Sequence, residues 1–280
     1  MEIGQNTYKL ILLDTNVLRE IVRNTNLAGK GFLQKFFSGK DKYAPCFSIY
    51  NALELMPYED IFEDFLEFFS SIPCLMTFPV KSILQEEYAC YLEGKAFKFT
   101  NQIAYAFTPY LEKESYNCKS FFNNLKKSTD LIAAIHSDID EFPSIAKDWE
   151  EQRTNAIQML KQLKLPLDMI DEKFYKSQEM KTVIKDLTNF NIPASSNTDI
   201  KKLPAARMME YSQFMRVYQI QKTLKPNDVM DVLISCIVPY VDAVITENFQ
   251  ADVYKKAKKI ISQIKDLEIY RLRDIRTNMN

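Results

Sequence analysis

The sequence contains little glycine and histidine, and these shortages exclude several kinds of enzyme. Only five glycines occur among 280 residues, and none lies after Gly94. A phosphate-binding loop needs glycine so that its backbone can approach the anion, but the pair Gly29 and Gly31 continues into neither GxGxxG nor GK[ST]. The single histidine, His136, lies in an apolar-patterned helix and is poorly placed as the base of a catalytic triad. We therefore expect neither such a nucleotide-binding loop nor a triad hydrolase.

Cysteine pairs and long apolar runs are also absent. The five cysteines form no CxxC pair, and their odd number and wide spacing are typical of reduced, packed thiols in a cytoplasmic protein rather than a zinc site. No apolar run reaches the roughly 18 residues that a membrane span needs, and the N-terminus lacks the pattern of a secretion signal. We expect a cytoplasmic protein with no membrane partner.

The overall composition is that of a folded protein with balanced charge. Hydrophobic residues make up 46% of the chain and aromatic residues 12%, which is enough apolar surface for a core. Basic residues number 36 and acidic residues 37, so the net charge is -1. Because the whole molecule does not attract a polyanion, any nucleic-acid site must be a local feature.

Short apolar runs alternate with amphipathic stretches at both ends of the chain. Each run is too short for a helix and leads through a polar turn into a helical pattern, except the last, which closes the chain. This alternation predicts an α/β fold with a parallel sheet covered on both faces. The predicted strands cover residues 8–13, 43–47, 74–78, 241–245 and 267–272.

The middle of the chain differs from both ends. Between residues 94 and 203 no comparable strand pattern occurs, and the segment predicts a large all-helical insertion. Its aromatic residues have helical spacing, so we interpret them as core packing rather than as a surface that stacks on bases. They are Phe97, Phe99, Tyr105, Phe107 and Tyr110.

Two acids near the predicted strand ends are candidates for chemistry. Asp14 directly follows the first strand, where ligands of parallel sheets bind, although an aspartate there can equally cap the next helix. Glu54 lies six residues after Ser48 in SIYNALELM, among apolar neighbours. Its carboxylate is therefore either on a narrow exposed edge or buried beside a cation.

Two further groups of polar residues lie near the C-terminal end. Asp228 and Asp231 share one face at the start of the apolar helix VLISCIV; capping accounts for Asp228, but less well for Asp231. The segment VDAVITEN brings Thr246, Glu247 and Asn248 to the end of a strand. Asn248 has the character of either a turn residue or a ligand.

Taken in this order, the pieces resemble the PIN-domain ribonucleases. The resemblance rests on the strand ending in Asp14-Thr15-Asn16, the S-x5-E pattern ending in Glu54, the ND-x2-D pattern ending in Asp231, and the T-x-N pattern ending in Asn248. It covers roughly residues 8–92 and 204–275. It implies a three-layer α/β/α sandwich with parallel strands in the order 3-2-1-4-5. Residues 1–93 and 204–280 would then form the nuclease domain, and residues 94–203 the helical insertion.

The resemblance also implies a metal-dependent endoribonuclease that hydrolyses RNA phosphodiester bonds through an activated water. Its catalytic residues would be Asp14, Glu54 and Asp231. Oxygen ligands without thiolate or imidazole favour Mg2+ or Mn2+. The proposed metal-binding set is Asp14, Glu54, Asp228, Asp231 and Asn248, the last standing where the family has a fourth acid. The residues proposed to orient ligands or waters are Thr15, Asn16, Thr246 and Glu247.

The candidate RNA contacts are four cations on and after the long helix that begins at Pro204: Arg207, Arg216, Lys222 and Lys225. The expected substrate is single-stranded or structured RNA, as for toxin or RNA-processing nucleases. An antitoxin or other protein partner and a homo-oligomer are further expectations.

Two alternatives remain beside the nuclease hypothesis. In the first, Asn248 marks lost chemistry, and the chain is an inactive PIN-like scaffold that binds RNA or protein. In the second, Asp14 is the nucleophile of an aspartyl-phosphate phosphatase; this is disfavoured because Asn16 stands where the DxDx[TV] pattern has its second acid.

Overall fold

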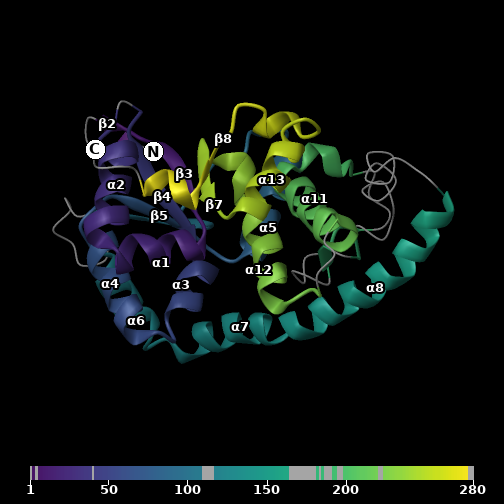
Figure 1. Ribbon diagram of the computed structural model, residues 1–280, viewed down its shortest axis with the longest axis horizontal. Coiled ribbons are helices and arrows are strands. Elements are labelled where there is room, and N and C mark those ends of the chain that lie inside the picture. Colours follow the sequence, from purple (N-terminus) through teal and green to yellow (C-terminus); the bar gives the residue numbers. More distant parts are fainter. Residues whose placement is uncertain are drawn as a thin grey trace. The chain divides into compact units, whose positions relative to one another are not determined.

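The chain forms two compact units (Figure 1). This computed structural model describes residues 2–3, 6–39, 41–108, 117–163, 181–182, 184–185, 191–193, 198–219 and 223–276. Unit 1 is drawn from Met1–Pro79, Phe99–Ala133 and Tyr240–Asn280, and unit 2 from Val80–Lys98 and Ala134–Pro239. These bounds differ from the predicted division at residues 94 and 203. Residues 80–93 and 204–239, expected in the nuclease domain, group with unit 2, and residues 99–133 of the expected insertion group with unit 1.

Unit 1 is built on a six-stranded mixed sheet, which confirms the α/β class. Its order is β6-β5-β4-β3-β7-β8, and all neighbouring strands are parallel except β5 and β6. The five predicted strands lie in the expected order 3-2-1-4-5, as β5-β4-β3-β7-β8, but the whole sheet differs from the prediction because the unpredicted strand β6 is added at the edge beside β5. The strands are β3 Lys9–Leu13, β4 Tyr43–Ser48, β5 Cys74–Thr77, β6 Ala104–Phe107, β7 Ala243–Thr246 and β8 Glu268–Arg271, with a separate antiparallel pair β1 Glu2–Ile3 and β2 Asn6–Thr7.

Strand β6 corrects the prediction that residues 94–203 are all helical. It pairs antiparallel with β5, with Cys74 opposite Phe107 and Thr77 opposite Ala104. Phe107 is buried against Phe47, which explains the aromatic side chain as core packing in a strand rather than in a helix. In this four-residue edge strand only the two end residues, Ala104 and Phe107, are buried, and their separation of three residues is easily mistaken for helical spacing.

The central strands are apolar along their whole length because both of their faces are covered. Every residue of β4, β5 and β7 is buried, as are all residues of β3 except Lys9. Helix α1 packs against α3 and α4, and α13 packs against β7 and β8. The helical segments of unit 1 are α1 Thr15–Arg23, η1 Thr25–Gly29, α2 Lys30–Phe32, η2 Leu33–Phe37, α3 Ile49–Leu55, α4 Glu59–Ser70, α6 Cys118–Leu125, α13 Asn248–Ala257, η6 Ser262–Ile264 and η7 Leu272–Ile275.

Unit 2 is helical in its described part, and α11 packs against four other helical segments of that unit. The buried Glu87 carboxylate accepts hydrogen bonds from the Ala205 and Ala206 amides at the start of α11, at 2.6 and 3.3 Å. Among the described residues, no helix has the length and apolar character needed to cross a bilayer. The segments are α5 Val80–Glu93, α8 Phe142–Leu163, η4 Ile200–Lys202, α11 Pro204–Gln219, α12 Pro226–Ile234 and η5 Ser235–Tyr240, while α7 Thr129–Asp140 includes residues of both units.

Candidate functional site

The carboxyl ends of β3 and β7 bring Asp14 beside the turn that follows β7. Leu13 lies opposite Ile245 in the parallel pair, and the Asp14 amide donates to the Ile245 carbonyl at 3.2 Å. Strand β3 has β4 on its other side, so the chain crosses over in opposite directions at this point. In parallel sheets such a crossover is where ligands bind.

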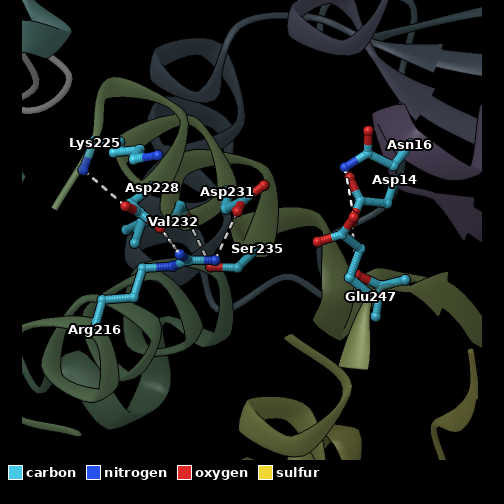
Figure 2. Close-up of polar contacts among 10 residues, drawn as sticks. Asp14, Asn16, Arg216, Lys225, Asp228, Asp231, Val232, Ser235 and Glu247 are labelled. Atoms are coloured by element: carbon cyan, nitrogen blue, oxygen red, sulfur yellow. Dashed lines mark hydrogen bonds and ion pairs between the residues drawn. The ribbon is translucent and has the colours of Figure 1, made fainter. Parts of the chain in front are cut away.

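Hydrogen bonds hold two acids at this sheet end (Figure 2). Thr246 Oγ1 donates to Asp14 Oδ2 at 2.8 Å, and Asn16 Nδ2 donates to Glu247 Oε1 at 2.7 Å. Asp14 occupies the position before α1, but its side chain makes no capping hydrogen bond. The capping interpretation therefore does not explain its carboxylate, which is half-buried and faces Thr246 instead.

Glu54 joins these acids from α3. The helix begins at a capping box in which Asn51 Oδ1 accepts the Ser48 amide, and Asn51 Nδ2 donates to Thr15 Oγ1 at 2.9 Å. This last bond ties α3 to the start of α1 and so fixes where the α3 side chains lie. Thr15 in turn hydrogen-bonds to Glu54.

The electrostatics show that Glu54 lies near two other carboxylates. Burial raises the pKa of Glu54 above its ordinary value, and the charges of Asp14 and Glu247 raise it further. The hydrogen bond with Thr15 and the positive charge of Arg19 act in the opposite direction. Unit 1 thus gathers three acids, Asp14, Glu54 and Glu247, that are far apart in the sequence, and the charges of Asp14 and Glu247 disfavour the ionised form of Glu54. We refer to them as the acid cluster.

Asp228 and Asp231 lie in unit 2, where an arginine side chain neutralises them (Figure 2). Arg216 of α11 forms an ion pair with Asp228 and a second one with Asp231 Oδ2 at 2.7 Å. Only 4% of the Arg216 side chain is exposed. The other oxygen of Asp228 accepts the Lys225 amide at 2.8 Å, so Asp228 also caps α12. The carboxylates of Asp228 and Asp231, which were expected to face a metal, are therefore paired with the guanidinium of Arg216.

The remaining predicted residues lie in varied surroundings. Arg207 is buried and forms an ion pair with Glu210, so the predicted contacts of Arg207 and Arg216 with RNA would require their ion pairs to break. Lys225 is exposed before α12, and Asn248 is exposed as the first residue of α13. Lys222 lies outside the described residues.

The chemistry of unit 1 suits a hard cation better than a soft one. The acid cluster offers only carboxylate oxygens, with hydroxyl and amide groups beside them, and a divalent cation would relieve its repulsion. Burial raises the pKa of the thiols of Cys46, Cys74 and Cys118 well above the ordinary value, which disfavours the thiolate form that a soft metal ion binds. Across the described ranges, no group of three or more histidine, cysteine, aspartate or glutamate side chains is arranged to hold a metal ion.

Arg19 also belongs to this region, although no motif in the sequence points to it. It lies on α1, five residues after Asp14, and its charge acts on Glu54 across the helix pair. Its spacing from Asp14 along α1 would have identified Arg19 as a candidate residue only if the orientation of α3 had been known.

Comparison of the chain with models of protein families, with characterised proteins and with solved structures found no significant match.

Proposed function

We propose that the chain is a PIN-like, metal-dependent endoribonuclease whose site is the acid cluster at the carboxyl ends of β3 and β7. The observation that carries the proposal is the position of Asp14, held by Thr246 at the carboxyl ends of β3 and β7, with Glu54 near enough for the charges of Asp14 and Glu247 to raise its pKa. Acids that repel one another at a ligand-binding sheet end cost stability, and a functional site explains why they are there. The three-layer arrangement of PIN domains and a cytoplasmic location belong to the same proposal.

Asp14 and Glu54 would hold the ion, with Glu247 close enough to act on the charge of Glu54. Bound Mg2+ or Mn2+ would neutralise the acids, lower the pKa of an attacking water and stabilise the charge that develops on the phosphate. The protein itself holds the carboxylate oxygen atoms of the acid cluster in position. Thr246 orients Asp14 and Asn16 orients Glu247 through the hydrogen bonds described above, so neither carboxylate needs to reorganise.

The test is cleavage of labelled single-stranded RNA in Mn2+ or EDTA by the wild type and by single variants. We expect EDTA to abolish cleavage, and Asp14→Asn and Glu54→Gln to lower it at least about 100-fold. Glu67→Gln, which changes an exposed acid on α4, is the matched control and should leave the rate unchanged. Cleavage that persists in EDTA and in Asp14→Asn would contradict the proposal.

A second candidate is an inactive scaffold of the same fold, and the Arg216 ion pairs favour it. In a scaffold, Arg216 permanently supplies the positive charge beside Asp228 and Asp231, and no metal is needed there. Calorimetry with Mn2+ separates the candidates. A nuclease should bind Mn2+ in a manner that Asp14→Asn removes, whereas a scaffold should bind RNA or protein without binding Mn2+.

A further inference from the structure

An exposed tyrosine stands in the turn directly after Glu54. Tyr58 lies between α3 and α4, and its amide donates to the Leu55 carbonyl at 2.9 Å. It is 54% exposed, whereas Phe62, one turn further along α4, is 1% exposed. The Tyr58 ring therefore contributes little to the core, and burial does not explain why an aromatic residue occurs here.

Arg19 is held against this ring. Its guanidinium carbon lies 5.3 Å from the centre of the Tyr58 ring, a distance at which a cation and an aromatic ring attract each other. Arg19 also lies close enough to Glu54 for its charge to act on that carboxylate. A fixed cation and an exposed ring thus adjoin the acid cluster, and all of these residues belong to unit 1.

A phosphodiester must approach the acid cluster against electrostatic repulsion, and a neighbouring cation reduces this cost. Aromatic rings paired with arginine are a usual binding surface for unpaired bases, because every base has a flat face and every linkage carries a negative charge. A double helix keeps its bases stacked inside and cannot offer them to Tyr58. The chemistry of this pair therefore selects single-stranded RNA.

We propose that Tyr58 and Arg19 form a nucleotide subsite in which a base of single-stranded RNA stacks on the Tyr58 ring while Arg19 contacts the adjoining phosphate. The subsite rests on the proposed ribonuclease function, since it places one nucleotide beside the acid cluster. Its contribution is to binding and not to the bond-breaking step. Tyr58 and Arg19 are accordingly substrate-binding residues.

The test measures binding in EDTA, where cleavage does not interfere. A fluorescent oligoadenylate is titrated with each protein, alongside an abasic strand of equal length and charge and an RNA duplex. We expect the wild type to prefer oligoadenylate to the abasic strand. Tyr58→Ala should weaken oligoadenylate binding roughly 10-fold and remove that preference, and Tyr58→Trp should retain it. Arg19→Met should weaken binding to both single strands.

Ile260→Ala is the matched control, because Ile260 is an exposed apolar residue of unit 1 that is 46% accessible, and its removal should change nothing. The subsite is overturned if Tyr58→Ala binds oligoadenylate as tightly as the wild type does. It is also overturned if Tyr58→Ala weakens binding of the RNA duplex as much as binding of oligoadenylate, or if the wild type does not bind oligoadenylate. In turnover, Tyr58→Ala should raise KM with little change in kcat, whereas Asp14→Asn should lower kcat. The subsite and the nuclease proposal therefore fail separately.

Discussion

If the proposed function is correct, Glu54 is the residue at which function and stability are most directly opposed. Its carboxylate is half-buried and repelled by Asp14 and Glu247, which is why its pKa is raised. A group whose pKa is raised in the folded protein favours folding at low pH, and this contribution is lost as pH rises through the folded-state value. At neutral pH, the raised pKa of Glu54 therefore corresponds to a lower free energy of unfolding.

We accordingly predict that Glu54→Gln stabilises the protein while it lowers the proposed RNA cleavage. In EDTA at pH 7 the gain should be about 0.5 to 2 kcal/mol, and it should shrink as the pH falls toward about 4. Urea unfolding at several pH values measures this gain. Glu67→Gln, the exposed control, should change stability by less than about 0.5 kcal/mol at every pH. A Glu54→Gln variant less stable than the wild type at pH 7 would argue against charge repulsion at the cluster.

Glu268 on β8 has the opposite behaviour. Its carboxylate accepts hydrogen bonds from Tyr270 at 2.5 Å and from Tyr43 at 2.6 Å, and these bonds lower its pKa. Burial and the same carboxylate raise the pKa of Tyr270 to about 12. The stabilising effect of Glu268 is present above its unfolded pKa of about 4.3 and is lost as pH falls through the lower folded value.

We predict that Glu268→Gln destabilises the protein at pH 7 and that the difference from the wild type disappears at low pH. Urea midpoints measured between pH 7 and pH 3 would show this convergence. Asp266→Asn is the control, since that side chain is 89% exposed and its removal should matter little. If the difference in stability between Glu268→Gln and the wild type stays constant with pH, the hydroxyls of Tyr43 and Tyr270 do not stabilise the ionised form of Glu268.

At the scale of elements, the glycine pair Gly29 and Gly31 serves packing. The sequence excludes a phosphate loop there but does not show what the glycines do. A β-carbon on Gly31 would overlap the backbone carbonyl oxygen of Ile275, so α2 and η7 approach each other at their backbones. Segments from the two ends of the chain come together in unit 1 through this absence of a side chain.

Gly31→Ala should therefore destabilise the protein by roughly 1 to 3 kcal/mol, because the rigid backbone of η7 must move. Thermal unfolding followed by circular dichroism measures the loss. Lys30→Ala changes the exposed neighbour in the same helix and should be nearly neutral. If Gly31→Ala is also neutral, the close approach of α2 and η7 is not needed for stability.

The strands of unit 1 show what could be predicted about elements. The strand-helix alternation predicts the five parallel strands; four of them are largely apolar because they are almost wholly buried, whereas β8 is only partly buried. The same reasoning missed β6, whose pairing is antiparallel and whose central residues are half-buried. The pattern of apolar residues in a sequence indicates which residues of a strand are buried. It does not indicate which neighbouring strand or helix buries them.

At the scale of the whole molecule, the division into two units predicts two cooperative regions. Glu87 of α5 caps the start of α11, and both belong to unit 2. Removing its carboxylate leaves two buried amides of α11 without their acceptor, which costs about 1 to 3 kcal/mol for each unsatisfied group.

We predict that Glu87→Ala increases native-state hydrogen exchange in α11 and α12 more than in β3, β4 and β7. Each unit has its own buried residues, and local opening follows such units. Glu86→Ala removes the adjacent acid of α5, which is less buried than Glu87, and provides the comparison. A uniform increase across both units would indicate one cooperative molecule.

The sequence by itself determined the α/β class, the strands that follow one another in parallel, and the candidate acids at their ends. These follow from local rules: apolar runs must be buried, and polar residues at strand ends meet along one edge of a sheet. Asp14 could therefore be considered as a candidate from its position after a strand, whereas Glu54 lies inside a helix and was selected through the resemblance to PIN-domain ribonucleases.

Only the tertiary structure decided which charges meet. The Asp14 carboxylate does not cap α1, Glu247 acts on Glu54, and Arg216 pairs with Asp228 and Asp231. The interactions of Glu247 with Glu54 and of Arg216 with the two aspartates join residues that are distant along the chain or lie on different helices. They therefore depend on how the helices pack. Electrostatic interactions fall off over a few ångströms, so spacing in a sequence cannot establish them.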